Sequence, residues 1–183
     1  VDDDYLTAVF RRVSALQPDL VAHTGDLITY GGPATFAQAK PLLENFPRGR
    51  LGTVLRNQST TVAGLTFVGL DDLWSGRFSL STAFATAKPD QPSIALCHNP
   101  DGCDLPGWEK HRGWILAGHT HGGQCKPPFL PPPLLPVKNR RYTAGEFLLS
   151  DGRRLYISRG VGHLLRVRFN VRPEVTVFTL RAV

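Results

Sequence analysis

The 183-residue chain has no methionine, only three cysteines and no long apolar run. The number of cysteines is odd and their spacing is not paired, so no disulfide framework is expected. Each thiol is interpreted as a small buried hydrophobe: Cys97, Cys103 and Cys125. No apolar stretch approaches the roughly 20 residues that a membrane-spanning helix needs. Basic residues are not interleaved with aromatic ones as in single-strand binders, so nucleic acid is not an expected partner.

The composition fits one soluble domain over residues 1–183. Hydrophobic residues make up 42% of the chain, which is enough for one core of ordinary size. The formal net charge of +6 favours anionic partners. Because the first residue is Val1, we do not expect the chain to start where translation starts, and an export signal or anchor before it would not be visible.

Three apolar runs end at residues that can bind a metal. Residues 20–24 lead to Gly25-Asp26, residues 94–97 to His98-Asn99, and residues 114–117 to Gly118-His119-Thr120-His121. In an α/β sheet, ligands gather at the carboxyl ends of the strands. One Asp and three His suit a divalent Mn, Fe, Zn or Co ion. The sequence therefore predicts a metal site formed by Asp26, His98, His119 and His121.

Other interpretations of these residues remain open. His119 and His121 are two residues apart, so in a strand they share a face, whereas in a turn they can serve two neighbouring metals. They can also be ordinary loop histidines. Cys97 and Cys125 can join them in a structural zinc site, although the close spacing of such sites is missing. His23, His111 and His163 are not expected to be ligands.

The order of these motifs and the residues in them resemble those of the calcineurin-like metallophosphoesterases, and of a bacterial branch of that family in particular. The segments that carry the resemblance are Gly25-Asp26, residues 69–76, residues 98–101 and residues 118–124. The resemblance implies a binuclear centre in which Asp26 bridges two metals. His98 and His119 would bind one metal with a motif asparagine, and His121 the other with an upstream Asp and His. Two such metals clamp phosphoryl oxygens and activate a hydroxide.

Two motifs of that family are missing. The family opens with a strand that ends in Asp-x-His, and residues 1–19 contain no histidine. It also carries Gly-Asn-His followed by Asp or Glu, but Asn45 and Asn57, the asparagines between Asp26 and His98, precede no histidine. We expect the first strand and an internal segment to be absent, with no catalytic residue retained. Truncation with an internal deletion is favoured over a degenerate protein.

The expected fold is α/β, a two-sheet sandwich flanked by helices, as the resemblance also implies. Apolar spacing predicts helices over residues 5–16 and 34–46. A hairpin turn is expected at Asp151-Gly152. The expected strands are residues 20–24, 54–55, 60–62, 65–70, 94–97, 114–117, 146–149, 155–158 and 175–180.

A proline-rich stretch, residues 126–136, follows the histidine pair and is expected to form an extended loop. It is interpreted either as an apolar lip that touches an acyl chain or membrane, or as a loop packed onto the domain. Lys126, Lys138, Arg140 and Arg141 support the first interpretation, with peripheral membrane contact through residues 126–141.

The expected activity is hydrolysis of a phosphodiester or pyrophosphate bond in a phosphorylated small molecule or lipid, such as a nucleotide-sugar lipid. Asn99 and Thr120 are candidates for orienting ligands or contacting substrate. With the motifs missing, we expect at most one bound metal and impaired hydrolysis. The alternative is an inactive family member that binds an anionic ligand. A bacterial cytoplasmic or membrane-associated location is expected.

Overall fold

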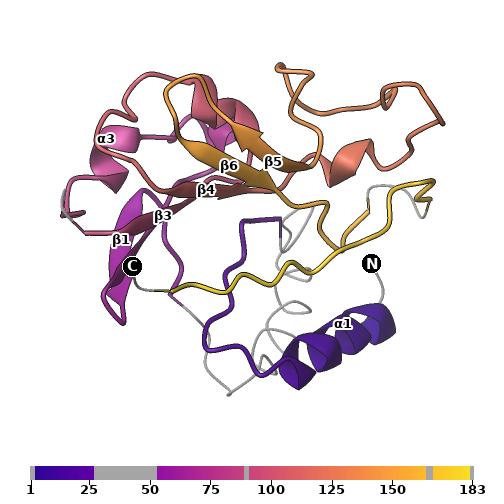
Figure 1. The fold of residues 1–183 in the computed structure, drawn as a ribbon, viewed down its shortest axis with the longest axis horizontal. Coiled ribbons are helices and arrows are strands. Elements are labelled where there is room, and N and C mark those ends of the chain that lie inside the picture. The colour runs from indigo at the N-terminus through magenta and orange to yellow at the C-terminus, as the bar shows by residue number, and fades with distance from the viewer. Residues whose placement is uncertain (1–2, 27–52, 89–90, 164–166, 182–183) are drawn as a thin grey trace.

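The computed structural model describes residues 3–26, 53–88, 91–163 and 167–181. Helix α1 (Asp3–Ala15) lies apart from a sheet whose strands fall between residues 58 and 157 (Figure 1). The other helical elements are α3 (Leu80–Ala83) and the 3-10 turns η1 (Leu73–Ser75), η2 (Pro100–Asp104) and η3 (His121–Gly123). The strands are β1 (Gln58–Val62), β2 (Leu65–Gly69), β3 (Ser93–Leu96), β4 (Trp114–Ala117), β5 (Gly145–Leu148) and β6 (Arg154–Ile157).

The six strands form one mixed sheet in the order β1-β2-β3-β4-β6-β5. The central strands β2, β3, β4 and β6 are parallel, and the edge strands β1 and β5 are antiparallel to their neighbours. Because parallel strands end at the same edge, the residues after β3 and β4 are brought together there. The α/β class predicted from the sequence is therefore confirmed.

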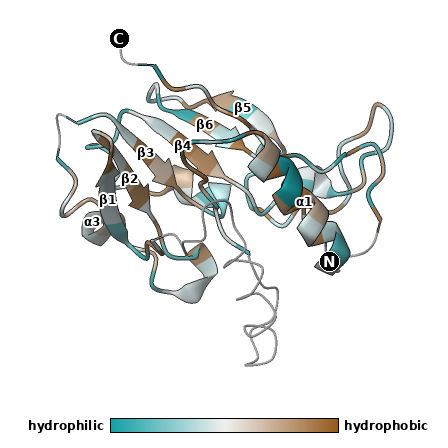
Figure 2. Ribbon diagram, turned by 90° about the horizontal axis from the view of Figure 1, so that it is seen from below, coloured by the Kyte–Doolittle hydropathy of each residue, from teal (hydrophilic) through white to brown (hydrophobic). Residues whose placement is uncertain are grey.

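One face of the sheet carries the hydrophobic core. Val68, Ala95, Ile115 and Leu155 are opposite one another across the four parallel strands, and each is 0% exposed. Strand residues two apart share a face, so this row marks the covered side of the sheet. The residues packed on this row come from α3, η2 and the loops beside them: Leu80, Ala83, Phe84, Cys103, Trp108 and Tyr142. Figure 2 shows the apolar character of β2, β3 and β4.

His111 lies within this core with no exposed surface. Its Nδ1 is 3.1 Å from the Ser93 hydroxyl and its Nε2 is 3.2 Å from the Trp114 carbonyl oxygen. Burial lowers the pKa of His111 to about 4, so the ring is neutral and structural. This agrees with the expectation that His111 is not a ligand.

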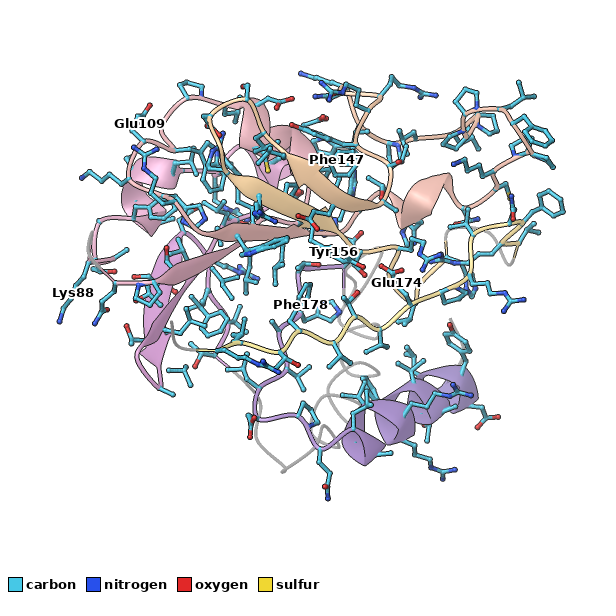
Figure 3. The ribbon with its side chains drawn as sticks, in the orientation of Figure 1. Lys88, Glu109, Phe147, Tyr156, Glu174 and Phe178 are labelled. Carbon is cyan, nitrogen blue, oxygen red and sulfur yellow. The ribbon has the colours of Figure 1, made fainter. Side chains whose placement is uncertain are left out.

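The opposite face of the sheet borders a cavity of about 1980 Å³. Phe67, Ile94 and Leu116 line it from the sheet, and the apolar side of α1 lines it from across the gap. In Figure 3, Tyr156 of β6 lies close to Glu174 and Phe178 of the C-terminal segment. The Tyr156 and Phe178 rings meet edge to face at 5.3 Å, and the Tyr156 hydroxyl donates to Glu174 at 3.2 Å.

The second sheet of the expected sandwich is not formed by the described residues. Residues 20–24 and 175–180 were predicted as strands, but both are extended without ladder pairing and line the cavity. A strand needs a neighbour to satisfy its N–H and C=O groups, and no described strand lies beside either segment. Val177 and Leu180 accordingly remain 64% and 59% exposed.

The remaining predictions of secondary structure mostly agree with the structure. The first helix spans Asp3–Ala15, close to the expected residues 5–16. The expected strands near residues 60–62, 65–70, 94–97, 114–117, 146–149 and 155–158 correspond to β1 to β6, whereas residues 54–55 form no strand. The helix expected over residues 34–46 lies outside the described residues. Among those that are described, no helix combines the length and the apolar character needed to cross a membrane.

Candidate metal centre

Three of the four predicted ligands converge at the carboxyl edge of the sheet. One ligand atom from each of Asp26, His98 and His119 lies within 4.8 Å of the others. The His98 Nε2 atom is 3.1 Å from Asp26 Oδ2 and 3.0 Å from His119 Nδ1. Separations near 3 Å are those of donors that each lie about 2.0–2.2 Å from one shared ion. We call Asp26, His98 and His119 the ligand triad.

Tight turns of the backbone place the triad: His98 and His119 follow β3 and β4, and Asp26 follows the unpaired residues 20–24. The Gly118 N–H donates to the His98 carbonyl at 3.0 Å, which ties the ends of β3 and β4 together. Asp26 and His119 have positive φ values of 56° and 67°, in the left-handed region. Gly25 has φ 130°, and a Cβ there would lie 2.7 Å from His98 Nδ1, so only glycine fits beside the His98 ring.

His119 is oriented with one ring nitrogen toward the other ligands of the triad. Its Nε2 is 2.9 Å from the Pro136 carbonyl oxygen, which can only accept, so Nε2 carries the proton. The lone pair of His119 Nδ1 is therefore directed at His98 and Asp26. Burial, and then the neighbouring His98, lower the pKa of His119, which keeps the ring neutral, as a metal ligand must be.

Asp26 supplies the negative charge of the triad. Its hydrogen bond with His98 lowers the pKa of the carboxyl group, and nearby His119 and His121 add to this effect against the opposing effect of burial. The carboxylate is thus ionised at neutral pH, and the 54% exposure of its side chain also favours the charged form. The His98 side chain is only 10% exposed, and its Nδ1 has no hydrogen-bond partner among the described residues. An ionised oxygen and imidazole nitrogens form a donor set that fits a divalent first-row ion.

His121, the fourth predicted ligand, is not part of the triad. Thr120 separates it from His119, and the positive φ values of His119 (67°) and His121 (49°) turn the backbone, so that the His121 ring contacts a different segment. Its Nδ1 lies 3.2 Å from the Gly162 carbonyl oxygen and 3.2 Å from a guanidinium nitrogen of Arg168. Burial lowers the pKa of His121 most, and the charge of Arg168 lowers it further. His121 is therefore neutral but lies beside a permanent cation.

Asn99 and Thr120 shape the turns that follow the ligands. Asn99 is 1% exposed, and its Oδ1 accepts from the Asp101 N–H at 3.0 Å, which begins η2. Thr120 is also 1% exposed; its hydroxyl donates to the Thr143 carbonyl at 2.5 Å and accepts from the Gly122 N–H. Both side chains therefore act on the backbone next to His98 and His119.

The cysteines do not enter the site. Cys97 is buried and its thiol donates to the Asn99 carbonyl at 3.2 Å, while the adjacent Cys103 and burial raise the pKa of Cys97. Cys125 lies elsewhere, with its sulfur 3.9 Å from the Val167 carbonyl. Among the residues that the structure describes, the group with metal-ligand geometry contains no sulfur. The alternative of a structural zinc site is wrong for these residues.

Two contacts of the site were not predicted from the sequence. The Pro136 carbonyl orients His119, and the Trp74 ring meets the His119 ring edge to face at 4.5 Å. Trp74 lies in a segment that carried the family resemblance, and Pro136 ends the proline-rich stretch. Those two segments could have been singled out, but nothing in the sequence indicates their contact with His119.

The chain is similar to several curated proteins. It is 39% identical over 134 residues to phosphodiesterase YaeI of Escherichia coli (strain K12), which covers 70% of this chain and 47% of YaeI. It is 30% identical over 212 residues to the uncharacterized metallophosphoesterase YkuE of Bacillus subtilis (strain 168), which covers 97% of this chain and 73% of YkuE.

A third relative is the UDP-2,3-diacylglucosamine pyrophosphatase LpxG of Chlamydia trachomatis serovar D, 32% identical over 147 residues, which cover 74% of this chain and 43% of LpxG. The chain thus spans about half the length of YaeI and LpxG. No protein-family model and no solved structure matches the chain.

Proposed function

The chain belongs to the metallophosphoesterases, the hydrolase family predicted from its motifs, and we propose that it is a metal-dependent phosphoesterase acting on a phosphodiester or pyrophosphate bond. The observation that supports this proposal is the ligand triad, with three donor atoms within 4.8 Å of one another. When bound, a divalent ion such as Mn, Fe, Zn or Co supplies Lewis acidity to a phosphoryl oxygen and an acidified water molecule.

Each triad residue has a distinct part in this proposal. The Asp26 carboxylate contributes charge that balances the ion. His98, held between Gly25 and the other two ligands, fixes the distance between them. His119 is locked by the Pro136 carbonyl and presents its Nδ1 lone pair without rearrangement. A preorganised donor set lowers the cost of binding both the ion and the charged substrate.

We propose that this chain holds one ion where the family's binuclear centre holds two. The resemblance assigns His121 to the second ion, but here His121 lies against the Arg168 guanidinium, and a second cation would be repelled there. The alignment with YkuE runs over 212 residues although this chain has 183, which supports an internal segment missing from a single, incomplete domain.

The function is tested by metal-dependent turnover of bis(p-nitrophenyl) phosphate. We expect slow hydrolysis in Mn buffer that a chelator abolishes and that falls to the buffer rate in an Asp26→Ala variant, because the triad loses its only anion. Asp19→Ala, which changes an exposed aspartate outside the triad, should retain the wild-type rate. Equal turnover in Asp26→Ala would remove Asp26 from the mechanism.

The alternative function is binding of an anionic ligand without hydrolysis. It is favoured by the net charge of +6 and by Arg168 beside His121 at the edge of the site. Phosphate binding measured by calorimetry, with no turnover in any of the four metals, would support this alternative over the phosphoesterase.

We also propose that the substrate is lipid-linked and that the proline-rich loop contacts an anionic membrane. The base of the loop packs on the domain, where Leu135 is buried, but its tip is exposed: Phe129 is 105%, Leu130 60% and Leu134 74% exposed. Exposed cations flank the tip: Lys126, Lys138, Arg140 and Arg141. Because Pro136 contacts His119, a loop on a membrane would bring the ligand triad close to the lipid headgroups.

Vesicle sedimentation tests the membrane contact. A Phe129→Ser, Leu130→Ser double variant should bind phosphatidylglycerol vesicles at least about tenfold more weakly, because burying each side chain contributes roughly 1.5–3 kcal/mol. Leu148→Ser is the matched control, since Leu148 is 71% exposed and lies on the edge strand β5, outside the proline-rich stretch. Binding should weaken with added salt. Equal sedimentation of the double variant and wild type would contradict the proposal.

A further inference from the structure

An exposed tryptophan stands beside the ligand triad. Trp74 is 65% exposed, although large aromatic residues are usually well buried. Its ring meets the His119 ring at 4.5 Å with an interplanar angle of 82°. Because Trp74 is 65% exposed, much of the indole surface remains open next to a metal ligand. Exposed aromatic surface of this kind commonly marks a place where a partner molecule binds.

The turn that carries Trp74 is held without help from the indole. The Asn57 Oδ1 atom accepts from the Asp71 and Ser79 N–H groups, both at 3.1 Å. The Ser75 hydroxyl donates to the Asp72 carbonyl at 2.7 Å within η1. Substitution of the Trp74 side chain should therefore leave the local backbone in place.

A shallow cavity of about 340 Å³ adjoins Trp74. It is lined by Trp74, Asp101, Leu135, Pro136, Val137 and Lys138. The Asp101 carboxylate accepts from the backbone N–H groups of Lys138 and Asn139 at 2.6 and 2.9 Å, so its charge is satisfied and the wall is fixed. The volume is at the lower end of ligand-binding pockets, enough for one ring system.

The cavity and the ligand triad share a wall. Pro136 lines the cavity and orients His119 with its carbonyl oxygen. Trp74 likewise lines the cavity and touches His119. A phosphoester positioned at the triad would thus extend one of its substituents over Trp74. At this position the flat indole, Pro136 and the flanking Lys138 favour a planar group attached to phosphate.

We propose that Trp74 and Leu135–Lys138 form a subsite that stacks a flat aromatic ring of the phosphoester substrate. The inference rests on the proposed function and narrows its substrate to phosphoesters that carry a ring. The ring can be a nucleobase or a simple aryl group, because the subsite recognises the shared planar surface. Stacking on one aromatic side chain changes affinity by roughly tenfold.

Calorimetry in Mn buffer tests the subsite with adenosine 5′-monophosphate, phenyl phosphate and methyl phosphate. We expect the two ring-bearing ligands to bind roughly tenfold tighter than methyl phosphate. Trp74→Ala should remove that preference without changing the affinity for methyl phosphate, and Trp74→Phe should restore most of it. Trp114→Phe is the matched control, because Trp114 begins β4 at the end opposite His119 and lies against Arg154.

The outcomes separate the subsite from the proposed function. If adenosine monophosphate binds more tightly than phenyl phosphate, the subsite prefers a nucleobase. If the two bind equally, the subsite accepts any aryl group. An equal loss for all three ligands in Trp74→Ala would overturn the subsite, since Trp74 would then act only through His119. If the chain prefers ring-bearing ligands but hydrolyses no phosphoester, the proposed phosphoesterase activity is wrong and the subsite is supported. If it hydrolyses phosphoesters without preferring ring-bearing ligands, the subsite is wrong and the activity is supported.

Discussion

Replacement of His98 by alanine is expected to lower the affinity of the chain for Mn or Zn by more than about a hundredfold. The His98 Nε2 atom lies 3.1 Å from Asp26 Oδ2 and 3.0 Å from His119 Nδ1, so its removal leaves the ion with two of its three protein ligands. Loss of a group that merely orients a ligand costs about 10–100-fold in affinity, and loss of the ligand itself should cost more. Competition with a chromophoric chelator measures this affinity directly.

The matched control is His121→Ala, which removes a histidine of the same motif that lies outside the triad. Because the His121 ring contacts Gly162 and Arg168, the variant should retain the wild-type affinity for the first ion. If His121→Ala lost affinity as severely as His98→Ala, the two histidines would serve one ion, contrary to the geometry described above.

The second large effect concerns rate. We expect this chain to hydrolyse bis(p-nitrophenyl) phosphate at least about a hundredfold more slowly than a family member that carries both the Asp-x-His and the Gly-Asn-His motifs. A positioned acid or base contributes typically 10²–10⁴-fold, and the motif histidine that would assist the leaving group is absent from this sequence. Parallel measurements of kcat/KM at one metal concentration give the ratio. Equal rates would mean that other residues replace the missing ones.

Secondary structure was predicted correctly where a segment has a clear apolar pattern and the strands that pair with it are among the described residues. Strand β4 was expected from four consecutive apolar residues, and both of its neighbours, β3 and β6, are in the sheet. Residues 20–24 have a similar apolar pattern, but no described strand lies beside them and they form no ladder. An apolar run thus predicts a strand only where a partner completes its hydrogen bonds.

The candidate site was predictable as far as its residues follow apolar runs. Asp26, His98 and His119 each come within a few residues of an apolar run, and the structure brings them together. The position of His121 depends on positive φ values at His119 and at His121 itself, which end the two-residue periodicity of a strand. Spacing alone therefore could not decide whether the two histidines share a face.

Contacts between remote segments set the rest of the site. The Pro136 carbonyl, the Trp74 ring and the Arg168 guanidinium reach the histidines from three different parts of the chain. Each of these contacts depends on tertiary packing, which no local pattern encodes.

The number of metal ions per chain, and its dependence on the triad, tests the central claim most directly. Elemental analysis of the purified chain after dialysis against Mn or Zn should find one ion per chain, one in His121→Ala, and none in Asp26→Ala or His98→Ala. Two tightly bound ions in the wild-type chain, or a full complement retained in Asp26→Ala and His98→Ala, would contradict a single site formed by Asp26, His98 and His119.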